Sequence, residues 1–159
     1  RSWPLNIGGT ASCTNAPQQH QELSDITSTF ASNIGFTGLM GMEFKFDSQR
    51  NGFYMIEPTV ARTDYQHEIA TLSGHNSLLQ IYRYITKETI PTYKLNQSAV
   101  IWRDEIADAN ALANGGEKTE PTVARHYNAV KRSNDLRPYI VTLVSRIRTR
   151  VKKSLNIKS

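Results

Sequence analysis

Gly41-Met-Glu-Phe-Lys-Phe-Asp-Ser-Gln-Arg-Asn-Gly-Phe-Tyr-Met-Ile-Glu-Pro-Thr59 is the stretch of this chain that decides its fold. Apolar and polar residues alternate on both sides of a polar segment, a pattern typical of two half-buried β-strands. The polar segment, Ser48 to Gly52, contains Asn51-Gly52, which is a strong signal for a tight turn. The pattern therefore predicts a β-hairpin with strands over residues 40–47 and 53–58.

The expected register of this hairpin places two acidic side chains side by side. The pairs that follow from a turn over residues 48–52 are Asp47 with Phe53, Lys45 with Met55, and Glu43 with Glu57. Side chains alternate between the two faces of a strand, so each face acquires one character. The face expected to be apolar carries Met42, Phe44, Phe46, Tyr54 and Ile56, and the face expected to be charged carries Glu43, Lys45, Asp47 and Glu57.

The opposed pair Glu43 and Glu57 is the candidate site. Directly opposed residues have Cβ atoms about 4.5 to 5.5 Å apart, and two carboxylates at that distance repel unless a proton, a cationic side chain or a metal ion lies between them. A hard, oxygen-seeking cation such as Mg²⁺ fits this requirement. The alternative is that both glutamates lie on a solvated face where Lys45 partly neutralises them. A register slip of one residue would also separate the pair.

Length and composition give the outer limits. The 159 residues suffice for one domain with its own core, or for a large part of one, and the start at Arg1 rather than Met suggests a piece of a longer protein. No apolar run approaches the roughly 18 residues that span a bilayer, and no signal-peptide pattern opens the chain, so a soluble, cytoplasmic protein is expected. The single cysteine, Cys13, excludes an intrachain disulfide and is expected to be a small buried or half-buried thiol.

Periodicity elsewhere predicts helices around the hairpin. Residues 1–16 are expected to form a short strand and a loop, Gly8 to Ser12, and helices are expected over 17–34, around 64–73, and over 77–87. Gly35 is expected to end the first helix, and a break is expected at Gly74-His-Asn76. The order predicts an α+β fold in which the hairpin is the centre of an antiparallel β-sheet backed by helices.

Three runs carry a resemblance to a known family: residues 34–47, residues 52–62, and Ala70-Thr-Leu-Ser-Gly-His-Asn76. Together they resemble the C-terminal part of the ATP-grasp superfamily, above all its carboxylate–amine ligases, over about residues 1–90. In that pattern an acidic residue on one strand and a Glu-x-Asn on the next hold Mg²⁺ against ATP. Glu43 matches the first position, Glu57 matches the second, and Thr59 stands where Asn is usual.

The resemblance implies an activity and a set of site residues. The expected reaction is ATP-dependent and Mg²⁺-dependent ligation of a small-molecule carboxylate to an amine through an acyl phosphate. Up to two Mg²⁺ ions, replaceable by Mn²⁺, would be held by Glu43, Glu57 and Thr59. Lys45 would contact the nucleotide, and Arg62 would be the catalytic cation that clamps a phosphate or a carboxylate.

The resemblance also implies that half of the site lies elsewhere. The lysines that contact the nucleotide phosphates belong to an N-terminal ATP-grasp subdomain of the same protein, which is expected before residue 1. The 159 residues alone are therefore expected not to turn over ATP. The alternative from another class is a non-catalytic module, derived from an ATP-grasp domain, that binds or assembles through its basic C-terminal helix.

Residues 91–159 are expected to be a mostly helical extension, with helices through Ala113, over 120–133, and over 137–155. The net charge of +5 is concentrated here, because residues 131–159 contain nine Lys or Arg and one acid. The last helix is amphipathic and basic, so it fits an anionic membrane surface, an acidic partner, or docking on its own domain with a solvated basic face. Nucleic acid is not expected, because interleaved aromatics and a binding module are lacking.

One hexapeptide occurs twice. Glu57-Pro-Thr-Val-Ala-Arg62 recurs as Glu120-Pro-Thr-Val-Ala-Arg125, but the flanking sequences differ. The second copy is expected to open a helix, since Pro suits the first helical turn. A second metal site is therefore not expected there.

Overall fold

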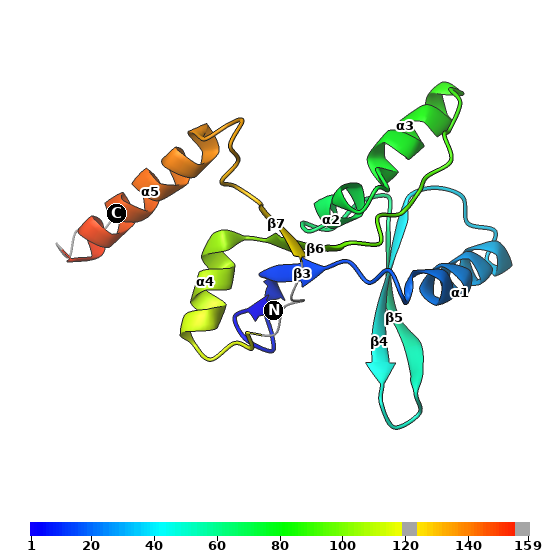
Figure 1. Cartoon of the computed structure of the whole chain (residues 1–159), viewed down its shortest axis with the longest axis horizontal. Helices are drawn as coiled ribbons and strands as arrows, with labels where there is room; N and C mark the ends of the chain where they lie inside the picture. Colours follow the sequence, from blue (N-terminus) through cyan, green and yellow to red (C-terminus); the bar gives the residue numbers. More distant parts are fainter. Residues whose placement is uncertain (119–123, 155–159) are drawn as a thin grey trace. The chain divides into compact units, whose positions relative to one another are not determined.

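A computed structural model describes residues 1–118 and 124–154, and it shows a mixed α+β protein (Figure 1). The helices are α1 (His20–Asn33), α2 (Glu68–Leu72), α3 (Ser77–Thr86), α4 (Glu105–Ala113) and α5 (Arg137–Ser154). The strands are β1 (Ser2–Trp3), β2 (Gly9–Thr10), β3 (Ser12–Thr14), β4 (Met40–Asp47), β5 (Gly52–Val60), β6 (Ala99–Arg103) and β7 (Ala124–Asn128). The predicted α+β class is confirmed.

The strands form three small sheets. Strands β1 and β2 pair antiparallel, β4 and β5 pair antiparallel, and a three-stranded sheet has the order β3, β6, β7. In the described part of the chain, β4 and β5 pair only with each other. The prediction that the hairpin is the centre of a larger antiparallel sheet is therefore wrong. The hairpin sequence specifies its own turn and pairing, but nothing in it specifies a third strand.

The described residues divide into two compact units, which are considered separately. The first contains residues 1–12, 102–118 and 126–154, and the second contains residues 13–101 with 124–125. Both units are built from segments distant in sequence, because strands such as β6 carry the chain from one to the other. The boundary expected at residue 90 between an ATP-grasp subdomain and an extension stays a prediction.

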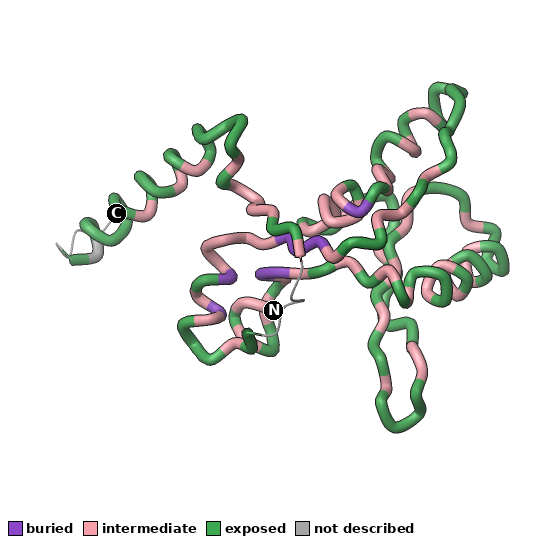
Figure 2. The backbone as a smooth tube through the Cα atoms, in the orientation of Figure 1, coloured by how far each residue is buried: buried purple, intermediate pink, exposed green. Residues whose placement is uncertain are grey.

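The first unit has a small, tightly packed centre around Trp102 and α4. Trp102 and Ala111 are buried, and α4 lies against β1. Figure 2 shows how few and how short the buried segments are. The Asp104 carboxylate caps α4 by accepting hydrogen bonds from the backbone N–H groups of Ile106 and Ala107, both at 3.0 Å. The helix ends at Ala113 as predicted, ahead of Gly115 with φ +93°.

The second unit contains three predicted helices. Helix α1 occupies His20–Asn33 of the expected 17–34, and Gly35 follows it with φ +63°, as predicted. Helix α3 begins where expected, because the Asn76 side chain accepts a hydrogen bond from Leu79 N at 2.9 Å. Helix α2 is shorter than the expected 64–73. At the predicted break, Gly74 has φ +97°, and a Cβ there would lie 2.6 Å from the Lys94 carbonyl oxygen.

The C-terminal region contains two strands that sequence analysis missed. Strand β6 carries a continuous buried run, Val100-Ile-Trp102, which is typical of a strand covered on both faces. The helix predicted over 120–133 is wrong where the structure describes it, because Ala124–Asn128 is strand β7. Pairing within the β3, β6, β7 sheet outweighs local helix propensity there. Residues 120–123 of the repeated hexapeptide lie outside the described residues.

Helix α5 confirms the last helix prediction over Arg137–Ser154. Asp135 lies two residues before the helix, and its carboxylate accepts a hydrogen bond from Arg137 N at 3.1 Å, which forms a turn that leads into α5. Residue 155, the predicted end, lies outside the described residues. None of the helices in residues 1–118 and 124–154 combines the length and apolar character needed to cross a membrane.

Candidate functional site

The hairpin turn positions the candidate site. One Asp47 carboxylate oxygen accepts hydrogen bonds from the backbone N–H groups of Gln49 at 2.9 Å and Arg50 at 3.2 Å, which folds the chain back on itself. Asn51 takes up a left-handed conformation with φ +48°, which Asn tolerates better than most residues. Gly52 already belongs to β5. The connection is therefore one residue shorter than predicted.

The observed register contains the predicted acidic pair, but the route to it differs. Glu43 opposes Glu57, as predicted. The other two predicted pairs are wrong, because Asp47 opposes Gly52 and Lys45 opposes Tyr54. The ladder shifts between Glu43 and Phe44, where one extra residue of β5 is accommodated. The shorter turn and this irregularity compensate each other. Glu43 and Glu57 are therefore opposed as predicted, although the predicted turn length and the predicted unbroken ladder are both wrong.

The extra residue is Ile56, and it decides on which face Glu57 lies. Phe44 opposes Met55, and the next pair is Glu43 with Glu57, so Ile56 has no partner of its own. In an unbroken ladder Glu43 would oppose Ile56, and Glu57 would lie on the other face of the sheet. A β-bulge of this kind re-aims side chains and is common next to functional sites. The bulge therefore places both carboxylates on one face.

The two faces of the hairpin differ from the prediction at four positions of β5, residues 53–56. Tyr54 lies on the charged face, since it opposes Lys45, and the Arg50 guanidinium lies 5.9 Å from the centre of its ring. Phe53 takes its place on the apolar face, with its ring centre 5.0 Å from that of Phe46. Ile56 sits at the bulge and is exposed. The apolar face is partly covered, because Met42 and Phe44 line a cavity of about 370 Å³ together with residues of α1.

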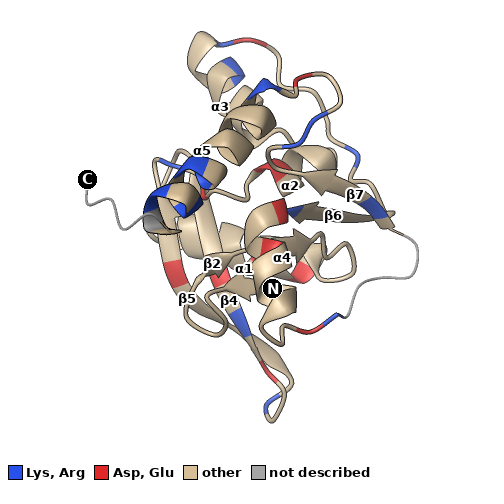
Figure 3. Ribbon diagram, turned by 90° about the vertical axis from the view of Figure 1, so that its left-hand side faces the viewer, with Lys and Arg blue, Asp and Glu red and all other residues tan. Residues whose placement is uncertain are grey.

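The predicted site residues lie along the charged face and just beyond it. Glu43, Lys45 and Glu57 are exposed, and Thr59, which opposes Gly41, is half-buried on the same face. Figure 3 shows acidic and basic positions interleaved along β4 and β5. Within residues 1–118 and 124–154, the carboxylates of Glu43 and Glu57 form no hydrogen bond or ion pair. Both are therefore accessible to an added cation.

Arg62 lies outside the strand. The hairpin ends with a hydrogen bond from Ala61 N to the Leu39 carbonyl oxygen at 2.9 Å, and Ala61 has φ +61°. Arg62 follows in a bend and is exposed. The backbone therefore turns away from the ladder directly before Arg62, and the structure does not bring this side chain into contact with Glu43 or Glu57.

The donor set suits a hard cation that keeps part of its water. No group of three or more His, Cys, Asp or Glu side chains gathers in the part of the chain that the structure describes. The hairpin instead offers two carboxylates and the Thr59 hydroxyl, all of them oxygen donors. Mg²⁺ is commonly bound by one or two carboxylates, with water and substrate phosphates completing its shell. The residues present therefore fit a partly hydrated Mg²⁺ ion, and they do not form a complete protein cage.

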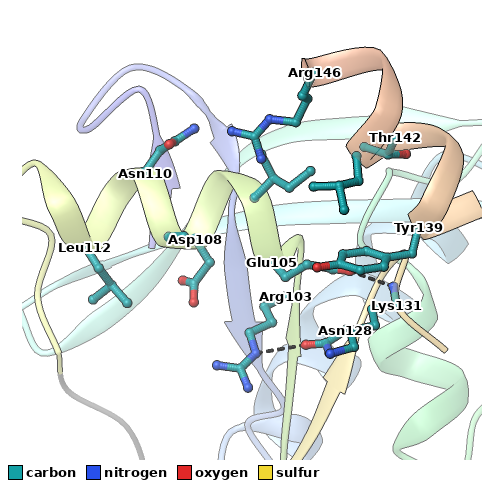
Figure 4. Close-up of a pocket in the computed structure, with 13 residues that line it drawn as sticks. Arg103, Glu105, Asp108, Asn110, Leu112, Asn128, Lys131, Tyr139, Thr142 and Arg146 are labelled. Carbon is teal, nitrogen blue, oxygen red and sulfur yellow. Dashed lines mark hydrogen bonds between the residues drawn. The ribbon is translucent and has the colours of Figure 1, made fainter. Parts of the chain in front are cut away.

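A cavity in the first unit, lined by both polar and apolar side chains, was not predicted from sequence. Its volume is about 460 Å³, and Figure 4 shows Tyr139 and Arg146 of α5 among its lining residues. Glu105 accepts a hydrogen bond from Lys131 N at 2.6 Å, and the Lys131 ammonium lies 5.5 Å from the centre of the Tyr139 ring. Arg103 Nε donates to the Asn128 side chain at 3.1 Å. The hydrogen-bonded pairs Glu105–Lys131 and Arg103–Asn128 are 26 and 25 residues apart in sequence, so no local pattern could indicate them.

Asp108 lines the same cavity and is engaged by Arg1. Arg1 Nε and Nη2 donate to its two oxygens at 2.6 and 3.1 Å. Burial on its own raises the pKa of Asp108, but hydrogen bonds from Arg1 and Ser12 and the charges of Arg1 and Arg103 outweigh it, so the pKa lies below its usual value. Asp108 is thus an ionised structural carboxylate.

Cys13 does not have the properties of a nucleophile. Burial raises the pKa of its thiol to about 11, so the thiol stays protonated near neutral pH. This agrees with the small, half-buried thiol expected from sequence.

Comparisons with known proteins add no relative. No protein-family model matches this chain, and no curated protein or solved structure matches it. A function for this chain can therefore be proposed only from the arrangement of its own residues.

Proposed function

We propose that this chain carries the metal-binding half of the active site of an ATP- and Mg²⁺-dependent carboxylate–amine ligase of the ATP-grasp type. The observation that supports the proposal most strongly is the pair Glu43 and Glu57, opposed in register on one face of the hairpin. The bulge at Ile56 is the local feature that produces this pairing.

Like charges directly opposed across two strands are destabilising, so the arrangement favours a role beyond the fold. Both carboxylates are exposed, and no described side chain neutralises them by direct contact. A bound divalent cation would convert this repulsion into attraction, since it accepts oxygen ligands from both strands. Without a cation, the repulsion between the two carboxylates would weaken the hairpin, and no described contact would offset it.

The proposal assigns a role to each site residue. Glu43 and Glu57 ligate Mg²⁺, or Mn²⁺ in its place, and the Thr59 hydroxyl supplies a further oxygen or holds a water. When bound, Mg²⁺ neutralises negative charge on the phosphate oxygens of ATP. Lys45 covers part of the nucleotide with its aliphatic stem, and Arg62 binds a phosphate or a carboxylate through its fork of N–H donors.

The chemistry requires placement and charge stabilisation, and it needs no nucleophile from the protein. One oxygen of a substrate carboxylate attacks the γ-phosphorus of ATP, and ADP leaves as the acyl phosphate forms. The nitrogen of an amine then attacks the acyl carbon, inorganic phosphate leaves, and the nitrogen loses a proton. We propose that a preceding ATP-grasp subdomain of the same protein contributes the phosphate-binding lysines, so residues 1–159 alone bind metal without turning over ATP.

Metal binding is tested with the 159-residue chain and Mn²⁺, whose free form is measured by electron paramagnetic resonance. The wild-type chain should reduce the signal of free Mn²⁺, and Glu43→Gln and Glu57→Gln should each weaken binding by about tenfold or more. Asp47→Asn is the matched control, because Asp47 lies on the same face but serves the turn, and Asn keeps the acceptor oxygen. Unchanged Mn²⁺ binding in both glutamate variants would overturn the metal assignment.

Catalysis is tested by Mg²⁺-dependent ATP consumption in the intact gene product. Loss of activity in Glu43→Gln and Glu57→Gln, but not in Asp47→Asn, supports the ligase. Mn²⁺ binding without any ATP consumption, under conditions where substrates are supplied as mixed carboxylates and amines, supports the non-catalytic module instead.

A further inference from the structure

Helix α5 (Arg137–Ser154) has an apolar stripe that the described residues of its own unit leave largely uncovered. Ile140, Val144, Ile147 and Val151 are spaced by four, three and four residues, so they lie along one face of the helix. Each is between 40 and 54 % exposed. An isolated surface isoleucine or valine needs no explanation, but four in line over three turns form a continuous apolar surface.

Cations border this stripe on both sides. At 3.6 residues per turn, Arg148 and Lys152 lie along one edge of the stripe, and Arg150 lies along the other; all three side chains are exposed. No acidic residue occurs anywhere in Arg137–Ser154. The helix is therefore apolar along its centre line and positive along both edges.

The face opposite the stripe is polar, and a neighbouring face borders the cavity of the first unit. Thr142 and Thr149 lie there, and their hydroxyls donate to the carbonyl oxygens of Pro138 at 2.8 Å and Ser145 at 2.9 Å. Four residues of α5 line the cavity that they share with α4, and none of them belongs to the stripe: Tyr139, Thr142, Leu143 and Arg146. The stripe thus lies outside the side of α5 that borders this cavity.

We propose that α5 binds in the plane of a bilayer surface that contains anionic lipids. The stripe would enter the boundary between headgroups and acyl chains, while the arginine and lysine side chains extend sideways and upward to the lipid phosphates. The charge pattern complements an anionic surface, and the flanking cations exclude insertion across the bilayer. This inference concerns a different surface from the hairpin and does not depend on the proposed ligase activity.

Other occupants fit the surface less well. A nucleic-acid strand would use the cations but leave the aliphatic stripe unburied, and the stripe offers no aromatic ring for base stacking. A second copy of the chain would bring identical arginines against one another along both edges. A lipid surface is the one class that uses the stripe and the cations on both edges together.

The test is co-sedimentation of the full chain with vesicles, one set of phosphatidylcholine alone and one an equal mixture of phosphatidylcholine and phosphatidylglycerol. The chain should partition onto the mixed vesicles at least tenfold more strongly, and the difference should shrink as salt is raised. Arg148→Gln with Arg150→Gln should weaken partitioning about 25-fold, at about fivefold per cation. Circular dichroism checks that α5 stays helical, and Arg148→Lys with Arg150→Lys should restore binding.

A matched control separates this surface from overall charge. Lys87→Gln with Lys94→Gln removes the same two charges from exposed positions of the other unit and should leave binding unchanged. Ile147→Gln should weaken binding without changing the net charge. Equal binding to both vesicle types, or an equal loss in the control pair, would overturn the proposal. Preferential capture of a single-stranded oligonucleotide, or dimerisation that Ile147→Gln abolishes, would assign the stripe to another occupant and overturn it too.

Discussion

Two places in this molecule hold carboxylates in opposite circumstances. Asp108 in α4 is buried, with its side chain 3 % exposed, and Arg1 contacts both of its oxygens. Glu43 and Glu57 are exposed, face each other across the hairpin, and have no direct partner among the described residues. The Asp108 carboxylate therefore holds two distant segments of the first unit together, whereas the Glu43 and Glu57 carboxylates are open to a ligand.

The largest expected effect comes from breaking the buried link. Asp108→Asn keeps the shape of the side chain but removes the negative charge that Arg1 Nε and Nη2 contact. Removing one member of a buried ion pair costs about 3 kcal/mol or more of the free energy of unfolding. Urea denaturation followed by circular dichroism measures this loss. The exposed Asp25 of α1 is the matched control, and Asp25→Asn should change the free energy of unfolding by less than about 0.5 kcal/mol.

If Asp108→Asn lowered the free energy of unfolding no more than Asp25→Asn does, Asp108 would not differ in stabilising effect from an exposed carboxylate. This result would mean that the ion pair is replaced by solvent without penalty. The assignment of Asp108 as a structural residue would then be wrong, and the cavity that it lines would become a stronger candidate site.

The next effect is the pH dependence of that same link. Because the pKa of Asp108 is lower in the folded protein than in the unfolded chain, the folded state favours the ionised form. The stabilisation is therefore present above the ordinary value of 3.8 and is lost as pH falls through the folded pKa. The difference in free energy of unfolding between wild type and Asp108→Asn should be constant near neutral pH and should shrink in acid. A difference that stays the same down to about pH 3 would contradict the assigned charge state.

His75 contributes in the same direction at higher pH. Burial lowers its pKa, with the charge of His20 adding to the effect, so the folded protein favours the neutral imidazole. Its stabilisation is complete above the ordinary value of 6.5 and is lost as pH falls through the lowered pKa. Wild type and Asp108→Asn both keep His75. Subtracting the free energy of unfolding of one from that of the other at each pH therefore removes the contribution of His75.

The hairpin shows what sequence can predict and where it stops. Alternation of polar and apolar residues predicts both strands, and the face of Glu43 follows from the strand period. The bulge at Ile56 could not be predicted, because an extra residue in one strand leaves no local signal in a run such as Tyr54-Met-Ile-Glu57. The predicted pair of glutamates is confirmed only because a shorter turn offsets that bulge.

Long-range structure escaped prediction for a different reason. Arg1 and Asp108 are separated by 107 positions, and no spacing rule connects such residues. Strand β7 was missed because a short polar segment takes its conformation from the sheet that it joins. The buried run Val100-Ile-Trp102 did carry a signal for strand β6, since a short apolar run flanked by polar residues indicates a covered strand. Helix ends, by contrast, were predictable wherever a cap such as Asn76 lies beside the helix.

The smallest expected effect is an increase in stability when one of the two opposed carboxylates of the hairpin is neutralised. Glu43→Gln removes one of two opposed negative charges, so the free energy of unfolding without metal should rise by about 0.5 kcal/mol at low salt. Glu22→Gln is the control, because Glu22 lies in the first turn of α1, where a negative charge is favourable, and its loss should lower stability by a few tenths of a kcal/mol. Adding Mg²⁺ should stabilise the wild type but not Glu43→Gln, since only a ligand of the folded state shifts unfolding. A fall in stability on Glu43→Gln, comparable with that of Asp108→Asn, would make Glu43 a structural acid and end the distinction between the two regions.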